Sequence, residues 1–247
     1  MDSPADPQLQ AYIGKAGRYL EDARRIYSRD PKKWENLLAA LTELANLRMK
    51  AGDLNRAESL LREALNLVNS LKQPSHSHRI GVISLLAYLA EMQERDQDAV
   101  TLYGDALHLA ESTGLGKTEK SGVVYNNLGM LYKKAGDLAA AERCYHRALT
   151  IFQEISGEES ASTAAILNNL GVLYYSNSQL DHALDMHRRA LVIREKVADA
   201  QGDNSELVQT YTNLAAVYKA LGDLENAQQY LDQSSKLFSG KENHSSS

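Results

Sequence analysis

Apolar and small residues recur three or four positions apart along most of the chain, which is the spacing of amphipathic α-helices. Leu128, Leu131 and Tyr132 show this spacing, and it returns from Leu170 onward. Proline occurs only four times and not at all after Pro74. Because proline lacks an amide proton and clashes with the preceding helical turn, its scarcity favours helix. The pattern predicts an all-α chain.

A longer motif returns along the chain at an almost constant interval. Residues 127–138 are repeated with changes at 169–180 and 213–224, and more distant copies lie at 43–54 and from 85 onward. One alanine occupies the same place in each copy, at intervals of 42, 42, 42 and 44 residues: Ala57, Ala99, Ala141, Ala183 and Ala227. Five copies in register at one period predict a repeat architecture.

Each copy predicts two helices joined by a tight turn. Gly-Asp pairs at 52–53, 136–137 and 222–223 separate the two apolar stretches of a copy. Glycine suits the backbone at the end of a helix, and aspartate can cap the start of the next one. We therefore expect a first and a second helix in every repeat, with the turn between them.

Columns of small and large residues predict how these helices pack. Small residues occupy one column of the first helix, namely Ala45, Ala87, Gly129, Gly171 and Ala215. A large column of the second helix is expected to fill the space beside the small residues: Leu61, Tyr103, Tyr145, His187 and Leu231. A single hairpin of this kind cannot bury its own apolar face, whereas a stack of three or more can.

Three segments carry a resemblance to a known family: Asn126-Asn127-Leu128-Gly129, residues 167–171 and residues 189–196. They resemble tetratricopeptide repeats (TPR) over residues 33–238, and the 42-residue period is most similar to kinesin light chain repeats. The resemblance implies a right-handed α-solenoid of about five TPR helix hairpins, at about 33–74, 75–116, 117–158, 159–202 and 203–238. Residues 8–30 are expected to form an N-terminal capping helix, and residues 1–7 and 239–247 to be disordered.

Composition and charge exclude several classes of function. The net charge is −5, from 27 basic and 32 acidic residues, and no basic run is long enough to follow a nucleic-acid backbone. No apolar run approaches the roughly 20 residues that span a bilayer, so membrane insertion is not expected. The start of the chain lacks the pattern of a secretory signal, and we expect a cytoplasmic protein. Cys144 is the single cysteine, which excludes an intramolecular disulfide.

The sequence contains only weak evidence for a catalytic site or a cofactor site. Gly116-Lys117-Thr118 matches the end of a phosphate-binding loop, but the glycine required five positions earlier is Glu111. Cys144 and His146 point to different faces of a helix, and His187 falls in the large packing column, so we expect no metal site. No residue has a recognisable catalytic context. We therefore expect no cofactor and no enzymatic activity.

The resemblance implies that the first helices line the concave groove in which such proteins hold peptides. The residues expected there are Asn46, Lys50, Tyr88, Asn126, Asn127, Lys133, Lys134, Asn168, Asn169, Tyr175, Asn213 and Lys219. A side-chain amide offers donors and an acceptor, so repeated asparagines can hold a peptide backbone. The alternative is that these asparagines bond between neighbouring helices and serve structure, and both interpretations can hold.

The charged residues of the expected groove indicate which kind of peptide it would bind. The groove columns carry Lys50, Lys133, Lys134 and Lys219 against only two glutamates, so an acidic peptide, or one ending in a free carboxylate, is favoured. The alternative is that these lysines are simply solvated. Adaptors that hold the C-terminal tails of heat-shock chaperones need a lysine and asparagine set at positions occupied here by Thr42, Asn46, Leu85, Val123 and Asn127. A chaperone-tail adaptor is therefore disfavoured.

The sequence as a whole predicts a non-enzymatic scaffold or adaptor that binds a partner protein or peptide in the concave groove. The alternative is a structural subunit of a larger complex that contacts its partners through the convex face or the end helices. Salt-dependent peptide binding would favour the first, and a large apolar contact would favour the second. The sequence does not determine the oligomeric state.

Overall fold

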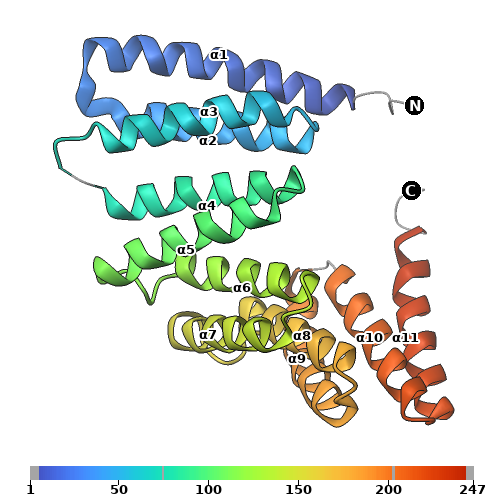
Figure 1. Cartoon of the computed structure of the whole chain (residues 1–247). Helices are drawn as coiled ribbons and strands as arrows, with labels where there is room; N and C mark the ends of the chain where they lie inside the picture. The colour runs from blue at the N-terminus through green and yellow to red at the C-terminus, as the bar shows by residue number, and fades with distance from the viewer. Residues whose placement is uncertain (1–5, 74, 202–203, 243–247) are drawn as a thin grey trace. The chain divides into compact units, whose positions relative to one another are not determined.

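A computed structural model describes residues 6–73, 75–201 and 204–242, with side chains described outside 198–201 and 238–242. Eleven α-helices and one short 3-10 helix follow one another in this part of the chain, and no strand occurs among these residues. The all-α prediction is confirmed, and the helices form the hairpins of an α-solenoid (Figure 1). The expected boundary between repeats at 202–203 lies outside the described residues.

The chain divides into two compact units, unit 1 at 1–116 and unit 2 at 117–247. Unit 1 contains α1 (Pro7–Arg29), η1 (Pro31–Lys33), α2 (Trp34–Lys50), α3 (Leu54–Asn69), α4 (His76–Met92) and α5 (Asp96–Ser112). Unit 2 contains α6 (Glu119–Lys134), α7 (Leu138–Ser156), α8 (Ala161–Ser176), α9 (Leu180–Gln201), α10 (Ser205–Ala220) and α11 (Leu224–Glu242). After α1, the helices pair in the order expected from the repeat, first helix with second helix.

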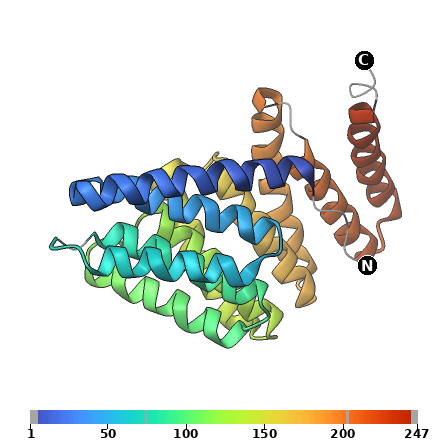
Figure 2. The same cartoon turned by 90° about the horizontal axis from the view of Figure 1, so that it is seen from above.

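Helix α1 is the lone helix expected before the first repeat, and it packs on α2 (Figure 2). The Asp6 side chain accepts a hydrogen bond from the backbone N–H of Gln8, and Pro7 occupies the first helical turn. Both are signals that begin a helix. The helix ends at Arg29, just before Asp30 and Pro31. Residues 1–7 were expected to be disordered, whereas Pro7 is the first residue of α1, because proline fits the first helical turn. Residues 1–5 lie outside the described part.

The last helix is longer than the sequence predicted. Helix α11 continues to Glu242, so the backbone of residues 239–242, which we expected in the irregular tail, is helical. The serines and the single glycine at this end do not stop the helix, because neither residue alone forbids the helical backbone. Residues 243–247 lie outside the described part.

The packing columns are buried as expected, with one exception. The alanines of the small column in the first helices, and the alanines that recur at one place in every copy, are at most 5% exposed. In the large column, Leu61, Tyr103, Tyr145 and His187 are at most 1% exposed. Leu231 in α11 is instead 42% exposed. Helix α11 is the last of the described helices, so no following first helix covers this position. Tyr230, the neighbouring residue, turns inward and stacks on Tyr218 at 5.6 Å.

Each of the five turns inside the repeats contains one residue with a left-handed backbone conformation, that is a positive φ, at the same position of the repeat. Glycine supplies it at Gly52, Gly136 and Gly222, with φ of 75°, 82° and 81°, whereas Glu94 and Ser178 adopt φ of 60° and 57°. A side chain at such a position costs free energy because its Cβ approaches the following carbonyl. The second and fourth turns therefore carry backbone strain that the other three avoid.

The aspartates that follow the glycines cap the next helix in two turns of three. The Asp137 carboxylate accepts from the backbone N–H of Ala140, and the Asp223 carboxylate accepts from the N–H of Asn226. Asp53 forms no such cap. It pairs instead with Arg48 at 3.1 Å and with Arg56 at 3.3 Å, because two cations stand within reach of its carboxylate. The capping prediction is wrong at this one turn.

Replacing Glu94 by glycine is expected to raise the free energy of unfolding by about 0.5–1 kcal/mol, because relief of the left-handed strain outweighs the extra entropy of an unfolded glycine. Gly136→Ala is the matched opposite change. No atom lies within 4 Å of a Cβ added there, so the backbone alone should lower stability, by about 1 kcal/mol. Urea unfolding curves measure both variants. A Glu94→Gly variant less stable than the parent would contradict the prediction.

Candidate functional site

The first helices of unit 2 present one continuous side to solvent, which we call the first-helix face of unit 2: Val123, Asn126, Asn127, Met130, Lys133 and Lys134 of α6, Asn169, Val172 and Tyr175 of α8, and Asn213, Ala216 and Lys219 of α10. On each helix these positions lie three or four residues apart, so they share one side. The face contains three large apolar side chains that are well exposed, Val123 at 43%, Met130 at 44% and Tyr175 at 41%.

Asparagine side chains link the first helices to one another. The Asn169 amide of α8 donates to Asn126 of α6 at 2.7 Å, and the Asn213 amide of α10 donates to Asn168 of α8 at 2.9 Å. Asn126 in turn donates to Asn127 at 3.3 Å. These bonds brace neighbouring repeats, which is the structural role that the sequence left open for the asparagines. Each amide still offers further hydrogen-bonding atoms, because it carries two donor protons and an acceptor oxygen.

Asn168 differs from the other asparagines because it is buried, with only 3% of its surface exposed. Its amide oxygen accepts from Asn213 and also lies 3.1 Å from Nδ1 of His187. A group so enclosed does not present its amide to a ligand. We therefore assign Asn168 to bracing and leave it out of the surface proposed for contact.

His187 is a core residue, as its place in the large packing column predicted. It is 1% exposed, and burial together with the positive charge of Arg194 lowers the pKa of its imidazole from 6.5 to about 4. Arg194 is itself buried and donates to the backbone oxygen of Glu206 at 2.7 Å. The imidazole is therefore neutral at ordinary pH, where it packs in the core and donates one hydrogen bond from Nδ1 to the Asn168 oxygen.

The first-helix face of unit 2 is more basic than the corresponding side of unit 1. Lys134 and Lys219 are exposed and Lys133 is half-buried. The two glutamates found in the same columns, Glu43 and Glu91, both belong to unit 1. The local excess of lysine expected from the sequence is therefore concentrated on α6 and α10.

In unit 1, the expected groove residues lie on the first helices α2 and α4. Asn46 and Lys50 of α2 are exposed, and Tyr88 of α4 is 45% exposed. Met92, one turn beyond Tyr88, is 37% exposed. Met92 and Met130 were not among the expected site residues, although they stand in the same columns as Lys50 and Tyr88. Val123, also not expected, stands outside those columns and lies one turn before Asn126 on α6. Exposure of a large apolar side chain is the signal that marks them, and the sequence does not give it.

The residues with candidate chemistry have structural partners. Thr118, in the phosphate-loop fragment, is the N-cap of α6, and Lys117 is 75% exposed and pairs with Glu154 at 3.0 Å. Nε2 of His146 lies 3.2 Å from the Tyr174 hydroxyl, and burial raises the pKa of the Cys144 thiol. Among the described residues no group of three or more His, Cys, Asp or Glu side chains is placed to hold a metal ion.

None of the helices in the part of the chain that the structure describes combines the length and the apolar character needed to cross a membrane.

Comparison with solved structures finds close relatives of this fold. BtubC (BKLC) from P. vanneervenii is 39% identical to the chain, with a TM-score of 0.90 over 96% of this chain and 93% of that one. A kinesin light chain-like protein of Podosopora anserina, with nearly identical TPR-like repeats, is 20% identical, with a TM-score of 0.68 over 83% and 96% of the two chains. The APC/C hetero-tetramer Cut9-Hcn1 is 18% identical, with a TM-score of 0.64 over 91% of this chain and 37% of that one.

No curated protein matches the chain. Three models of the tetratricopeptide repeat match it, at residues 40–75, 121–196 and 208–239. These segments fall on the hairpins α2–α3, α6–α7, α8–α9 and α10–α11, and together they cover more than half of the sequence. The chain belongs to the tetratricopeptide-repeat family, and its repeats resemble those of kinesin light chains.

Proposed function

We propose that the protein is a non-enzymatic scaffold that binds an acidic peptide segment of a partner protein on the first-helix face of unit 2. Tetratricopeptide repeats serve as protein-binding scaffolds, and the family assignment supports this general role. The choice of this face, and of an acidic ligand, is our own inference from the side chains that line it.

The observation that carries the proposal is the combination of three kinds of group on one face. Exposed apolar side chains, Met130 and Tyr175, stand beside the braced amides of Asn127, Asn169 and Asn213. Apolar contacts supply the free energy of association, and amides held in place by neighbouring bonds lose little entropy when a peptide backbone pairs with them. Such a face suits an extended segment with alternating apolar and polar side chains.

Lysine determines the charge preference. Lys134 and Lys219 are exposed on α6 and α10, and the acidic members of these columns lie in unit 1. Exposed lysines attract an acidic partner over a distance of about 10 Å at 0.1 M salt and raise the rate of association more than the final affinity. We therefore expect binding that weakens as salt is added.

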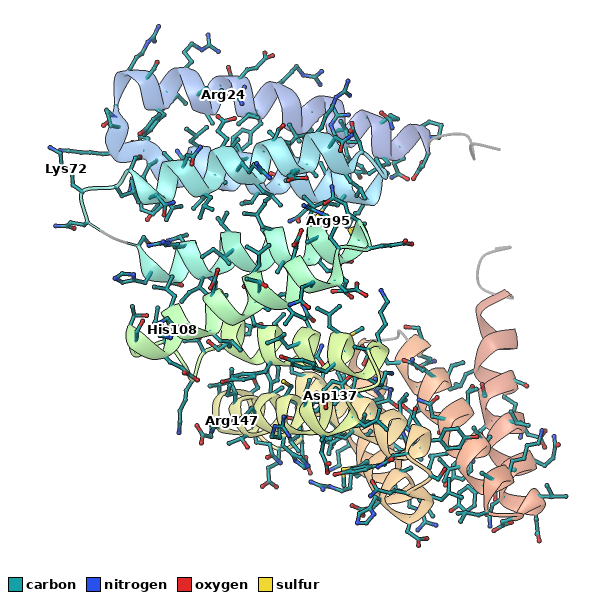
Figure 3. All side chains as sticks on the ribbon, in the orientation of Figure 1. Arg24, Lys72, Arg95, His108, Asp137 and Arg147 are labelled. Carbon is teal, nitrogen blue, oxygen red and sulfur yellow. The ribbon has the colours of Figure 1, made fainter. Side chains whose placement is uncertain are left out.

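Selection of peptides from a random 12-residue phage library against the full chain tests the proposal. Binders should be enriched in Asp and Glu, and fluorescence anisotropy should show about tenfold weaker binding after Tyr175→Ala or after Lys134→Glu with Lys219→Glu. Lys72→Glu, a change of an exposed lysine labelled in Figure 3 on the α3–α4 connection of unit 1, is the matched control and should leave affinity unchanged.

Circular dichroism of each variant must match the parent, so that lost binding is not lost folding. If the folded variants bind the selected peptides as tightly as the parent, this face is not the binding site. The alternative is a structural subunit that contacts its partners through end helices or second helices. The exposed apolar side chains outside the first helices, such as Val192 at 53%, favour it.

A further inference from the structure

Helix α1 carries an exposed apolar stripe. Tyr12 is 53% exposed, Tyr19 47% and Ile26 46%. The three residues are seven positions apart, which places them on one side of the helix over about four turns. Figures 1 and 2 show α1 as the end helix of unit 1, with α2 and α3 on one side of it only. The flank of α1 next to its buried side thus offers large apolar side chains where the end of a solenoid needs polar ones.

The repeat register explains why two of these positions, Tyr19 and Ile26, are apolar. Ala16, Leu20 and Ala23 of α1 stand 41 residues before Ala57, Leu61 and Ala64 of α3, so α1 has the packing pattern of a second helix. In that register Tyr19 and Ile26 correspond to Leu60 and Leu67 of α3 and to Leu102 and Leu109 of α5.

In α3 and α5 these positions are covered. Leu67 is 7% exposed, and Leu60 and Leu102 pack against the core of unit 1. Leu60 lines a furrow of about 310 Å³ together with Gly17 and Leu20 of the preceding α1. An internal second helix therefore uses this stripe to pack on the helices that precede it in the stack. On α1 no described helix precedes, so the stripe is a stacking surface without an occupant among the described helices of unit 1.

Charges beside the stripe point to a second copy as that occupant. Lys15 and Asp22 are exposed on the outer edge of the stripe, on either side of Tyr19. We propose that α1 pairs in an antiparallel manner with α1 of a second copy of this chain, about a two-fold axis at Tyr19. Tyr19 then meets Tyr19 of the second copy, Tyr12 meets its Ile26, and Lys15 meets its Asp22, each of the last two contacts occurring twice.

The antiparallel direction follows from these charges. A two-fold contact is self-complementary, because the same patch supplies both sides. In a parallel pair the two-fold axis runs along the helices, so Lys15 and Asp22 of the two copies would lie on opposite edges of the seam and no contact between Lys15 and Asp22 would form. Asp22 already pairs with Arg25 of its own helix, and Lys15 of the second copy adds a second cation beside the same carboxylate.

The contact is one helix pair, smaller than a standard stable interface of about 1,600 Å². We therefore expect a weak dimer, with a Kd on the order of 10–100 µM. The pairing surface lies on unit 1 and is independent of the peptide site proposed on unit 2. A failure of either proposal leaves the other unaffected.

Disulfide cross-linking of the full chain tests the register. In a Cys144→Ser background, Tyr19→Cys should give a covalent dimer under mild oxidation, because the two-fold axis brings residue 19 beside its own copy. Tyr12→Cys alone should not cross-link, since the two copies of residue 12 stand about 21 Å apart, well beyond disulfide reach. A mixture of Tyr12→Cys and Ile26→Cys chains should form the mixed dimer.

Sedimentation velocity from about 5 to 500 µM measures the association itself. Tyr19→Glu should abolish the dimer, and Lys15→Glu should weaken it about tenfold. Lys15→Glu combined with Asp22→Lys should restore it to within about threefold of the parent, because the two charges exchange places. Lys72→Glu, on an exposed lysine away from α1, should have no effect.

Three results would overturn the pairing. One is a monomer at every concentration, which would leave the stripe to a different protein. Another is efficient self-cross-linking through Tyr12→Cys, which would indicate a parallel pair. The third is a dimer that survives Tyr19→Glu, which would place the interface elsewhere on the chain.

Discussion

Gly171→Ala is expected to lower the free energy of unfolding by about 2–3 kcal/mol. A Cβ added at Gly171 in α8 would lie 2.5 Å from Cε1 of His187, much closer than two such atoms approach in a folded protein. The ring cannot move away easily, because it is 1% exposed and Nδ1 lies within hydrogen-bond distance of Asn168. Alanine is the better helix former by about 1 kcal/mol, so any net loss of stability comes from the clash.

A second substitution tests that explanation. In the first repeat the same pair of positions holds Ala45 and Leu61, both fully buried. His187→Leu in the Gly171→Ala background copies that pair and should recover most of the lost stability. Urea unfolding of the two single variants and the double variant gives the coupling between the sites. If the double variant is no more stable than Gly171→Ala, the clash with His187 is not the cause of the loss.

This pair also shows how far the sequence could predict the fold. The 42-residue period and the small and large columns predicted which residues are buried, because a repeat that stacks on its own copies must keep the same contacts in every copy. Glycine at 129 and 171 was explained as a point of close approach, and the aromatic rings of Tyr145 and His187 are what approach there. The repeat period and the sizes of the residues were sufficient to predict which of these positions are buried.

Burial in the last described helix and the residues of the turns were harder to predict, because the neighbours of that helix and the residue types in the turns differ from copy to copy. Leu231 is in the packing column by register yet 42% exposed, because no described helix follows α11 to cover it. Glu94 and Ser178 adopt the left-handed conformation that glycine provides elsewhere, because the surrounding hairpin fixes the turn whatever residue occupies it. The repeat register predicts the position of a residue on its helix, while the exposure of its side chain depends on which neighbouring helices are present.

The candidate site was predicted only in outline. The columns placed the asparagines on the first helices, but Asn168 and Asn169 are adjacent in sequence and differ in burial: one is 3% exposed and the other is partly exposed. Two consecutive helical positions are about 100° apart, so a small rotation of α8 decides which of them faces solvent. That rotation is set by packing between repeats, which the sequence pattern does not resolve.

Acid is expected to destabilise the protein through His187 before most carboxylates take up protons. The pKa of His187 is about 4 in the folded chain, below the ordinary value of 6.5, because burial and the charge of Arg194 disfavour the imidazolium. The side-chain oxygen of Asn168 accepts a hydrogen bond from Nδ1 of His187, so the neutral imidazole carries its proton on Nδ1. A second proton would have to bind Nε2 inside the core. The folded chain therefore resists protonation that the unfolded chain accepts.

The sign and the pH range follow from this lowered pKa. Above pH 6.5 the ring is neutral in both states, so its contribution to stability is fully present. As the pH falls from 6.5 towards 4 the unfolded chain binds a proton that the folded chain does not, and stability falls by about 2 kcal/mol between pH 7 and pH 5 and by about 3 kcal/mol by pH 4. Below pH 4 both states are protonated at this residue and no further loss arises from it.

His187→Leu should remove this pH dependence, since leucine does not titrate and the same column holds Leu61 in the first repeat. Urea unfolding at pH 7, 6, 5 and 4 measures the free energy of the parent and of the variant, and the difference between their slopes isolates His187 from the carboxylates that both share. Parallel curves for parent and His187→Leu would mean that the buried ring accepts its proton as readily in the folded chain as in the unfolded one.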